Sequence, residues 1–176
     1  MVAEKMKADT AWAKAVQEML RYDPEFNIED LTFEAKEIFM EYYCNFLSGN
    51  VEYLKKVSSG EAAIMQALVE LRQKEGWRYK YDELLDCGFP NFTGAKISEG
   101  HPAFTFTIVV QEFEQKINVE DGSIYVYQPP VVEGQDPDKA PKPDLGNRVM
   151  KSTYSFTLAR HEDPDIELTG HYWNFV

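Results

Sequence analysis

The sequence predicts an α+β fold, in which helices come first along the chain and an antiparallel sheet follows. Apolar residues recur at helical spacing up to Gly76, and from Trp77 onwards they alternate with polar residues, as in half-buried strands. The length of 176 residues suits one domain with a single hydrophobic core. We therefore expect N-terminal helices packed in the concave face of a curved antiparallel sheet.

The first helix is predicted from a short amphipathic pattern. Thr10 is a suitable N-cap residue, and helical angles are disfavoured at Asp23 because Pro24 follows it. The apolar face between these points is formed by Trp12, Val16, Met19 and Leu20. We assign residues 1–26 to this helix and 27–176 to one α+β domain. The apolar face is a candidate surface for a membrane or a partner.

A long helix carries the strongest pattern in the chain. Asn27 is a suitable cap and Gly49 a suitable terminator. The stripe expected to be buried comprises Ile28, Leu31, Ala35, Ile38, Phe39, Tyr42, Phe46 and Leu47. The opposite face carries Glu29, Asp30, Glu34, Glu37 and Glu41, with Lys36 as its one basic residue. We expect water to solvate this acidic face.

Two shorter helices are predicted before Gly76. Asn50 begins the first, which carries Val51, Leu54 and Val57. Ser58 and Glu61 form a candidate capping box for the second. The apolar residues of this second helix are Ile64, Ala67, Leu68 and Leu71.

Three alternating segments are predicted to be strands. Their apolar positions are Trp77, Tyr79 and Tyr81, then Phe104, Phe106, Ile108 and Val110, then Tyr154, Phe156 and Leu158. A hairpin turn at residues 120–123 joins the 102–119 strand to residues 124–127, since its Asp-Gly pair suits a tight turn. A second hairpin turns at residues 161–165 and ends in a strand over 166–176. Residues 129–147 hold five of the nine prolines and are predicted to form a long loop.

The composition excludes several classes of function. The formal net charge is −12 and the pI about 4.7, which argues against binding to nucleic acid through phosphate contacts. The longest stretch without Asp, Glu, Lys or Arg runs for twelve residues from Gly100 to Gln111, whereas a spanning helix needs roughly 18 apolar positions. The same acidic surface suits positively charged partners.

Catalytic motifs are missing from the sequence, and we expect neither an enzyme nor a cofactor or metal site. His171, placed in the last strand, is a candidate for an acid–base dyad with Asp82 or Asp86, although a structural role fits it better. The segment 161–165 holds four candidate metal ligands, but a turn of this composition normally points them outward. Cys44 and Cys87 are expected to be small buried hydrophobes.

The aromatic strand faces are predicted first of all to build the core, and second to line a pocket or a partner groove. The residues concerned are Phe104, Phe106, Ile108, Tyr154, Phe156, Leu158, Tyr172 and Trp173.

Several stretches, taken in order, resemble the C-terminal domain of mitochondrial import inner membrane translocase subunit forty-four. Residues 20–26 (LRYDPEF) and 47–50 (LSGN) with Leu54-Lys55 resemble two of its helix junctions. Residues 102–111, 131–139 and 148–160, and the terminal Trp173, resemble its strands and the loop between them. The similarity covers about residues 12–176.

The resemblance implies a nuclear transport factor 2-like (NTF2-like) fold and a non-enzymatic adaptor. The adaptor would be peripheral on the matrix face of the mitochondrial inner membrane, linking the translocase channel to the import motor chaperone. Its other partners would be presequences or unfolded polypeptides, with weak cardiolipin contact through the first helix. By this resemblance, Phe104, Phe106, Tyr154, Phe156 and Trp173 build the cup. Asp23 and Pro24 act as a hinge that sets the angle at which the first helix leaves it.

Two alternatives remain open from the sequence. Related domains occur in a mitochondrial large-subunit ribosomal protein near the tunnel exit, so the chain is alternatively a subunit of that assembly or of another membrane complex. By fold analogy alone, the cup is alternatively the active site of a small-molecule isomerase or dehydratase.

Overall fold

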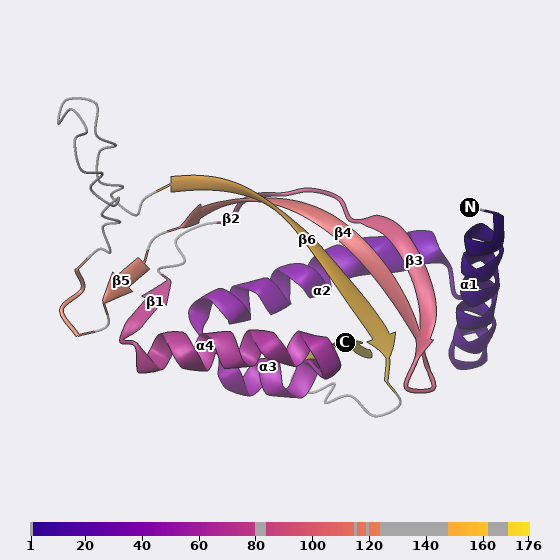
Figure 1. Ribbon diagram of the computed structural model, residues 1–176, viewed down its shortest axis with the longest axis horizontal. Coiled ribbons are helices and arrows are strands. Elements are labelled where there is room, and N and C mark those ends of the chain that lie inside the picture. The colour runs from indigo at the N-terminus through magenta and orange to yellow at the C-terminus, as the bar shows by residue number, and fades with distance from the viewer. Residues whose placement is uncertain (1, 80–83, 115, 119, 124–147, 162–168) are drawn as a thin grey trace.

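The computed structural model describes residues 2–79, 84–114, 116–118, 120–123, 148–161 and 169–176. Over these residues, four α-helices pack against a curled antiparallel sheet (Figure 1). The predicted α+β class and the NTF2-like cup are confirmed. The predicted loop 129–147, the strand at 124–127 and most of the turn at 161–165 lie outside the described residues.

Helix α1 (Val2–Tyr22) begins well before the N-cap predicted at Thr10. The predicted N-cap at Thr10 is wrong, because the residues before it are mainly Ala, Glu, Lys and Met, which favour helix and contain neither Gly nor Pro. The predicted end is confirmed, since the helix stops just before Asp23 and Pro24. The helix stands across one end of the sheet, where it contacts β3 and β4 (Figure 1).

Helix α2 (Ile28–Ser48) has the predicted bounds and caps. The Asn27 side chain accepts a hydrogen bond from the Glu29 N–H at 2.9 Å, and this satisfies one of the free donors at the helix start. At the other end Gly49 adopts a left-handed φ of 78°, which an L residue with a side chain rarely adopts. The helix lies under the sheet, with its apolar stripe buried.

Helices α3 (Val51–Val57) and α4 (Ile64–Lys74) follow, separated by the 3₁₀ turn η1 (Gly60–Ala63). Asn50 caps α3 as predicted, with its side chain accepting from the Tyr53 N–H at 3.2 Å. The predicted capping box at Ser58 is wrong, because the Ser58 hydroxyl donates to the Leu54 carbonyl and the 3₁₀ turn intervenes.

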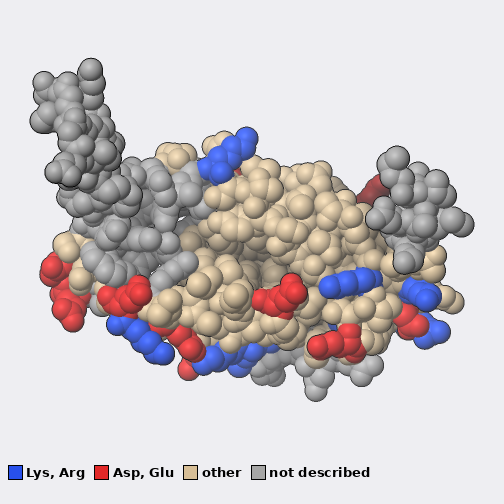
Figure 2. All heavy atoms as spheres, viewed as in Figure 1, with Lys and Arg blue, Asp and Glu red and all other residues tan. Residues whose placement is uncertain are grey.

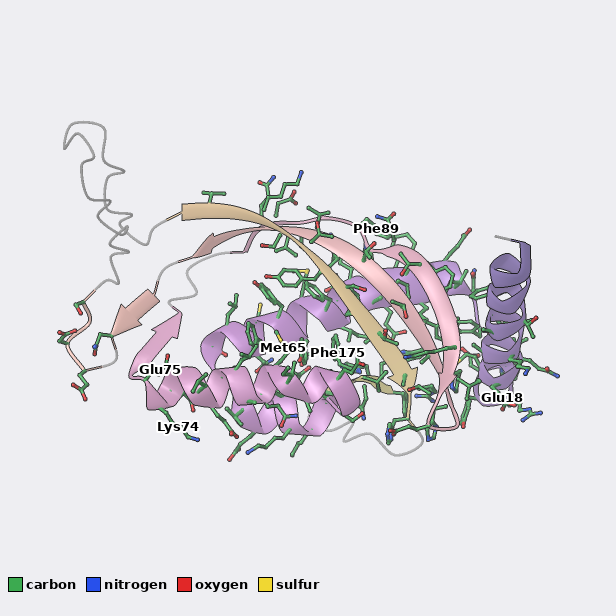
Figure 3. All side chains as sticks on the ribbon, viewed as in Figure 1. Glu18, Met65, Lys74, Glu75, Phe89 and Phe175 are labelled. Carbon is green, nitrogen blue, oxygen red and sulfur yellow. The ribbon has the colours of Figure 1, made fainter. Side chains whose placement is uncertain are left out.

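The apolar stripe predicted for α4 faces solvent. Ile64 is 65% and Leu71 52% exposed, and Ala67 and Leu68 are exposed as well. The side that packs inward carries Val69 and Met65 instead (Met65 is labelled in Figure 3). The large uncharged area of the near face in Figure 2 lies over the sheet, whereas charged residues of both signs mark the edge where α3 and α4 lie.

The main sheet has five strands in the order β2-β4-β6-β7, with β3 also paired to β4, and β1 and β5 form a separate antiparallel pair. The strands are β1 (Trp77–Tyr79), β2 (Leu84–Cys87), β3 (Asn91–Ser98), β4 (His101–Glu114), β5 (Lys116–Asn118), β6 (Arg148–Arg160) and β7 (Trp173–Phe175). Because β4 pairs with β6 over twelve of its fourteen residues, from Ala103 opposite Ala159 to Glu114 opposite Arg148, these two strands form the centre of the cup.

The sequence analysis missed β2 and β3, which share one edge of β4. Between them the chain passes so close to β4 that a Cβ on Gly88 would lie 3.0 Å from the Val109 carbonyl oxygen. The Gly88 N–H donates to that oxygen at 2.8 Å, so the pairing edge continues through the break between the two strands.

The predicted strand over 166–176 is too long. Among the described residues it comprises only Trp173–Phe175, and Thr169 to Tyr172 form a bend before it. His171 therefore lies just ahead of β7 and outside the strand, where its Nδ1 accepts a hydrogen bond from the Trp173 N–H at 3.1 Å. A bend with Gly170 at a left-handed φ of 71° cannot continue a ladder.

None of the helices among the described residues carries an apolar stretch long enough to cross a bilayer.

Candidate functional site

The concave face of the sheet is filled by its own side chains. Phe104, Phe106, Ile108 and Leu158 are fully buried, and Phe156 and Trp173 nearly so. Tyr154 is half-buried, and its hydroxyl shares a 2.7 Å hydrogen bond with that of Tyr43 on α2. Among the residues predicted to line the cup, only Tyr172 is exposed, because it lies in the bend before β7.

A cavity of about 190 Å³ opens beside this core, at the junction of α1, α2 and the β6–β7 edge. Met19, Phe26, Leu31 and Trp173 supply its apolar lining. Its acidic side chains are Asp23, Glu25, Asp30 and Glu34, and the one cation among its described lining residues is Arg160. We call this cavity the acidic pocket.

The turn between α1 and α2 places two of these carboxylates at the acidic pocket. The Asp23 carbonyl accepts from the Phe26 N–H at 3.1 Å, and the Asp23 carboxylate accepts from the Glu25 N–H at 3.0 Å. These bonds close a tight turn around Pro24, whose fixed φ suits it. The predicted hinge at Asp23 and Pro24 thus lies at the wall of the pocket.

Arg160, at the end of β6, has its charge held by neighbouring groups. Its guanidinium carbon lies 4.0 Å from the centre of the Tyr172 ring, a cation–π distance, and a terminal nitrogen donates to the Tyr172 carbonyl at 3.2 Å. Burial lowers the pKa of Arg160, while Tyr172 and Glu34 oppose that shift. A guanidinium remains charged in this environment, so it offsets one of the four carboxylates.

Glu34 lies where α2 meets the sheet edge. Burial raises the pKa of its carboxyl group, and a hydrogen bond from the Trp173 side chain and the charge of Arg160 act in the opposite direction. Desolvation is the largest of these effects, but it is only partial, because the Glu34 side chain stays exposed on one side. An incoming cation would relieve this cost.

Taken together, the acidic pocket has a formal charge of −3, from four carboxylates and one guanidinium. A concave surface lined by one sign of charge attracts ligands of the opposite sign. The apolar lining from Met19 and Phe26 suits the methylene stem of a long basic side chain. The arrangement fits a lysine or arginine side chain.

The apolar face of α1 is largely occupied by packing. The Trp12 ring lies 5.0 Å from that of Phe92 and 6.3 Å from that of Phe104, Met19 is buried, and Val16 packs against the core. Leu20 alone among the four predicted residues is exposed. A membrane contact through α1 would therefore have to use another part of its surface.

The residues considered for catalysis do not come together. Asp86 on β2 pairs with Gln111 on β4. Trp173 on β7 pairs with Arg160 on β6, and the neighbouring Ala159 pairs with Ala103 at the other end of β4. The eight residue steps from Ala103 to Gln111 span about 26 Å of strand, too far for a dyad with His171. Asp82 lies outside the described residues.

The structure gives no metal cluster either, over the part of the chain that it describes. Of the 161–165 segment only His161 is described, and its ring stacks on that of His101 at 5.2 Å. Cys87 is buried and Cys44 half-buried, both as free thiols. Burial raises the pKa of the Cys87 thiol, which makes it a poor nucleophile.

The sequence analysis missed the acidic pocket, although it identified the carboxylates of α2 as an acidic face. Comparison of the chain with protein-family models and with curated proteins finds no match. The translocase-subunit family therefore stays a prediction from the sequence resemblance.

Proposed function

We propose that this chain is a non-enzymatic interaction domain that binds basic segments of other polypeptides. The observation that carries the proposal is the acidic pocket, whose described lining combines four carboxylates with apolar side chains and a single cation, Arg160. The raised pKa of Glu34 supports it, because a bound cation would compensate a carboxylate that burial penalises.

The sequence resemblance supports a place of action. In this proposal the domain works at the matrix face of the mitochondrial inner membrane, as an adaptor between the translocase channel and the import motor chaperone. Presequences are positively charged, so they are polypeptides of the kind that an acidic pocket selects. Cardiolipin contact is weak in this proposal, since the overall charge is −12 and Trp12 and Met19 are already packed.

The packed concave face favours this proposal over the isomerase or dehydratase. A small-molecule active site needs a pocket with convergent polar groups. In the described part of the cup, that space is taken by Phe104, Phe106 and Phe156. The Phe156 ring lies 5.6 Å from that of Phe106 and 4.9 Å from that of Phe39 on α2.

A crosslinking pull-down from mitochondria tests the proposal. The chain should recover channel subunits and the motor chaperone, and the double variant Asp30→Asn/Glu34→Gln should recover less of both. Glu52→Gln on α3, which changes an exposed carboxylate away from the acidic pocket, is the matched control. Recovery of ribosomal or respiratory proteins without translocase subunits would overturn the proposal in favour of the alternative assemblies.

A further inference from the structure

Two phenylalanines on different elements form an exposed aromatic pair next to the acidic pocket. Phe33 on α2 is 63% exposed and Phe89, between β2 and β3, is 49% exposed. Their rings meet edge to face with centroids 4.8 Å apart. Edge-to-face contact at this distance is a favourable aromatic geometry, yet much of both rings still faces water.

The backbone holds Phe89 firmly in this position. Gly88, just before it, is bonded to Val109 on β4, and Pro90, just after it, is buried. Because the residues on both sides are fixed, the ring of Phe89 is presented to the surface at little further entropic cost. Figure 3 shows Phe89, labelled, on the stretch that leads into β3.

Three carboxylates and one lysine lie next to Phe33 on the surface of α2. Glu29 and Glu37 lie four residues before and after it and Asp30 three residues before it, and all three are exposed, whereas Lys36, three residues after it, is half-buried. Residues at these spacings are neighbours on a helix, with Cβ atoms about 5–6 Å apart. Asp30 also lines the acidic pocket, so this carboxylate links the surroundings of Phe33 to the pocket.

We propose that the Phe33–Phe89 pair is the apolar anchor for a basic amphipathic segment, whose cations are bound by Glu29, Asp30 and Glu37. This proposal rests on the proposed function and specifies its ligand as a segment with both basic and large apolar residues. Charge complementarity selects this partner, because three carboxylates and one lysine lie next to Phe33, on a chain of net charge −12. A neutral apolar partner would leave these carboxylates beside the interface without a counter-charge.

The proposal separates two contributions to binding. The carboxylates attract any basic segment and act in a salt-dependent way. The aromatic pair adds affinity only when the segment brings an apolar side chain, because burying apolar surface requires such a partner.

Fluorescence anisotropy with two labelled synthetic peptides of equal charge tests this. One carries Leu at helical spacing among Lys residues, and the other has Ser in place of each Leu. The full chain should bind the Leu/Lys peptide more tightly. Phe33→Ser and Phe89→Ser should each weaken that complex about tenfold and leave the Ser/Lys peptide unaffected, since burial of a phenylalanine ring is worth about that much.

Leu71→Ser is the matched control, because Leu71 is exposed to a similar extent on α4. Unchanged binding of the Ser/Lys peptide also shows that each variant is folded. If the two peptides bind wild type equally, or if the Phe variants bind the Leu/Lys peptide like wild type, the anchor is overturned while the proposed function stands. If neither peptide binds, both proposals fail.

Discussion

The two faces of α2 differ in chemistry, and the difference separates stability from recognition. One face packs Leu31, Ile38 and Phe39 into the core, with the Phe39 ring 4.9 Å from that of Phe156 on the sheet. The other face presents Asp30 and carboxylates on both sides of Phe33 to solvent. A single helix thus packs the core on one side and carries the binding surface that we propose on the other, so substitutions on its two sides should have different effects.

The largest expected effect tests the core side of this comparison. Phe104 is fully buried, with its ring 5.2 Å from that of Phe26 and 6.0 Å from that of Trp173. Phe104→Ala should lower the free energy of unfolding by about 3–5 kcal/mol, because it leaves a cavity. Phe33→Ala should change it by no more than about 0.5 kcal/mol. Chemical denaturation measures both, and similar costs would contradict the separation.

A smaller effect is expected at the start of α2. Asn27→Ala removes the acceptor for the Glu29 N–H and should cost about 1 kcal/mol of stability. Asn27→Asp keeps the acceptor and is the control. Because Asn27 also lines the acidic pocket, thermal unfolding and peptide binding should be measured on the same samples. Equal stability of the Ala and Asp variants would show that the cap contributes nothing.

The next effect is a pH dependence of stability that we assign to His171, just before β7. Burial lowers the pKa of His171 below its usual value of about 6.5. The unfolded chain then binds a proton more readily than the native one, so this contribution to stability is full above about pH 6.5 and is lost as the pH falls toward the native pKa.

His171→Asn keeps an acceptor for the Trp173 N–H and removes the titration. Denaturation at several pH values should therefore show a shallower acid loss of stability for this variant, by at most about 1.4 kcal/mol per pH unit. If the free energy of unfolding falls equally with pH in wild type and variant, the pH dependence does not come from His171.

The smallest effect concerns Glu34. Because burial raises its pKa, it should protonate at a higher pH than an ordinary carboxyl group, and binding of a basic peptide should weaken accordingly as the solution is acidified. At neutral pH, Glu34→Gln should bind the peptide about threefold more weakly than wild type. Its affinity should also depend less on pH. Identical pH profiles for the two proteins would exclude Glu34 from the site.

Local patterns predicted much of the fold. The caps and stripe of α2 were predictable because Asn27, Gly49 and a regular apolar spacing all specify the same helix. The alternation in β4 and β6 was readable for the same reason, since one face of each strand is buried. In α4, apolar residues lie on two sides, so periodicity predicts the helix without predicting which side the core takes.

The features that the sequence did not predict, strand β3 and the acidic pocket, depend on tertiary structure. Strand β3 is largely exposed and carries Gly94 and Lys96, so it has no clear alternation. The acidic pocket joins the turn at Asp23 to Arg160, which lies far along the chain. From the sequence, Glu34 was one of several solvated carboxylates, and only packing beside Trp173 and Arg160 distinguishes it.

The central claim is that the acidic pocket binds cations. Its most direct test is the affinity of a lysine-rich peptide for wild type, Asp30→Asn/Glu34→Gln and the control Glu52→Gln, measured at low and at physiological salt. The account predicts about tenfold weaker binding by the double variant at low salt, a smaller difference at higher salt, and no change for the control. Equal affinity of wild type and double variant at low salt would contradict it.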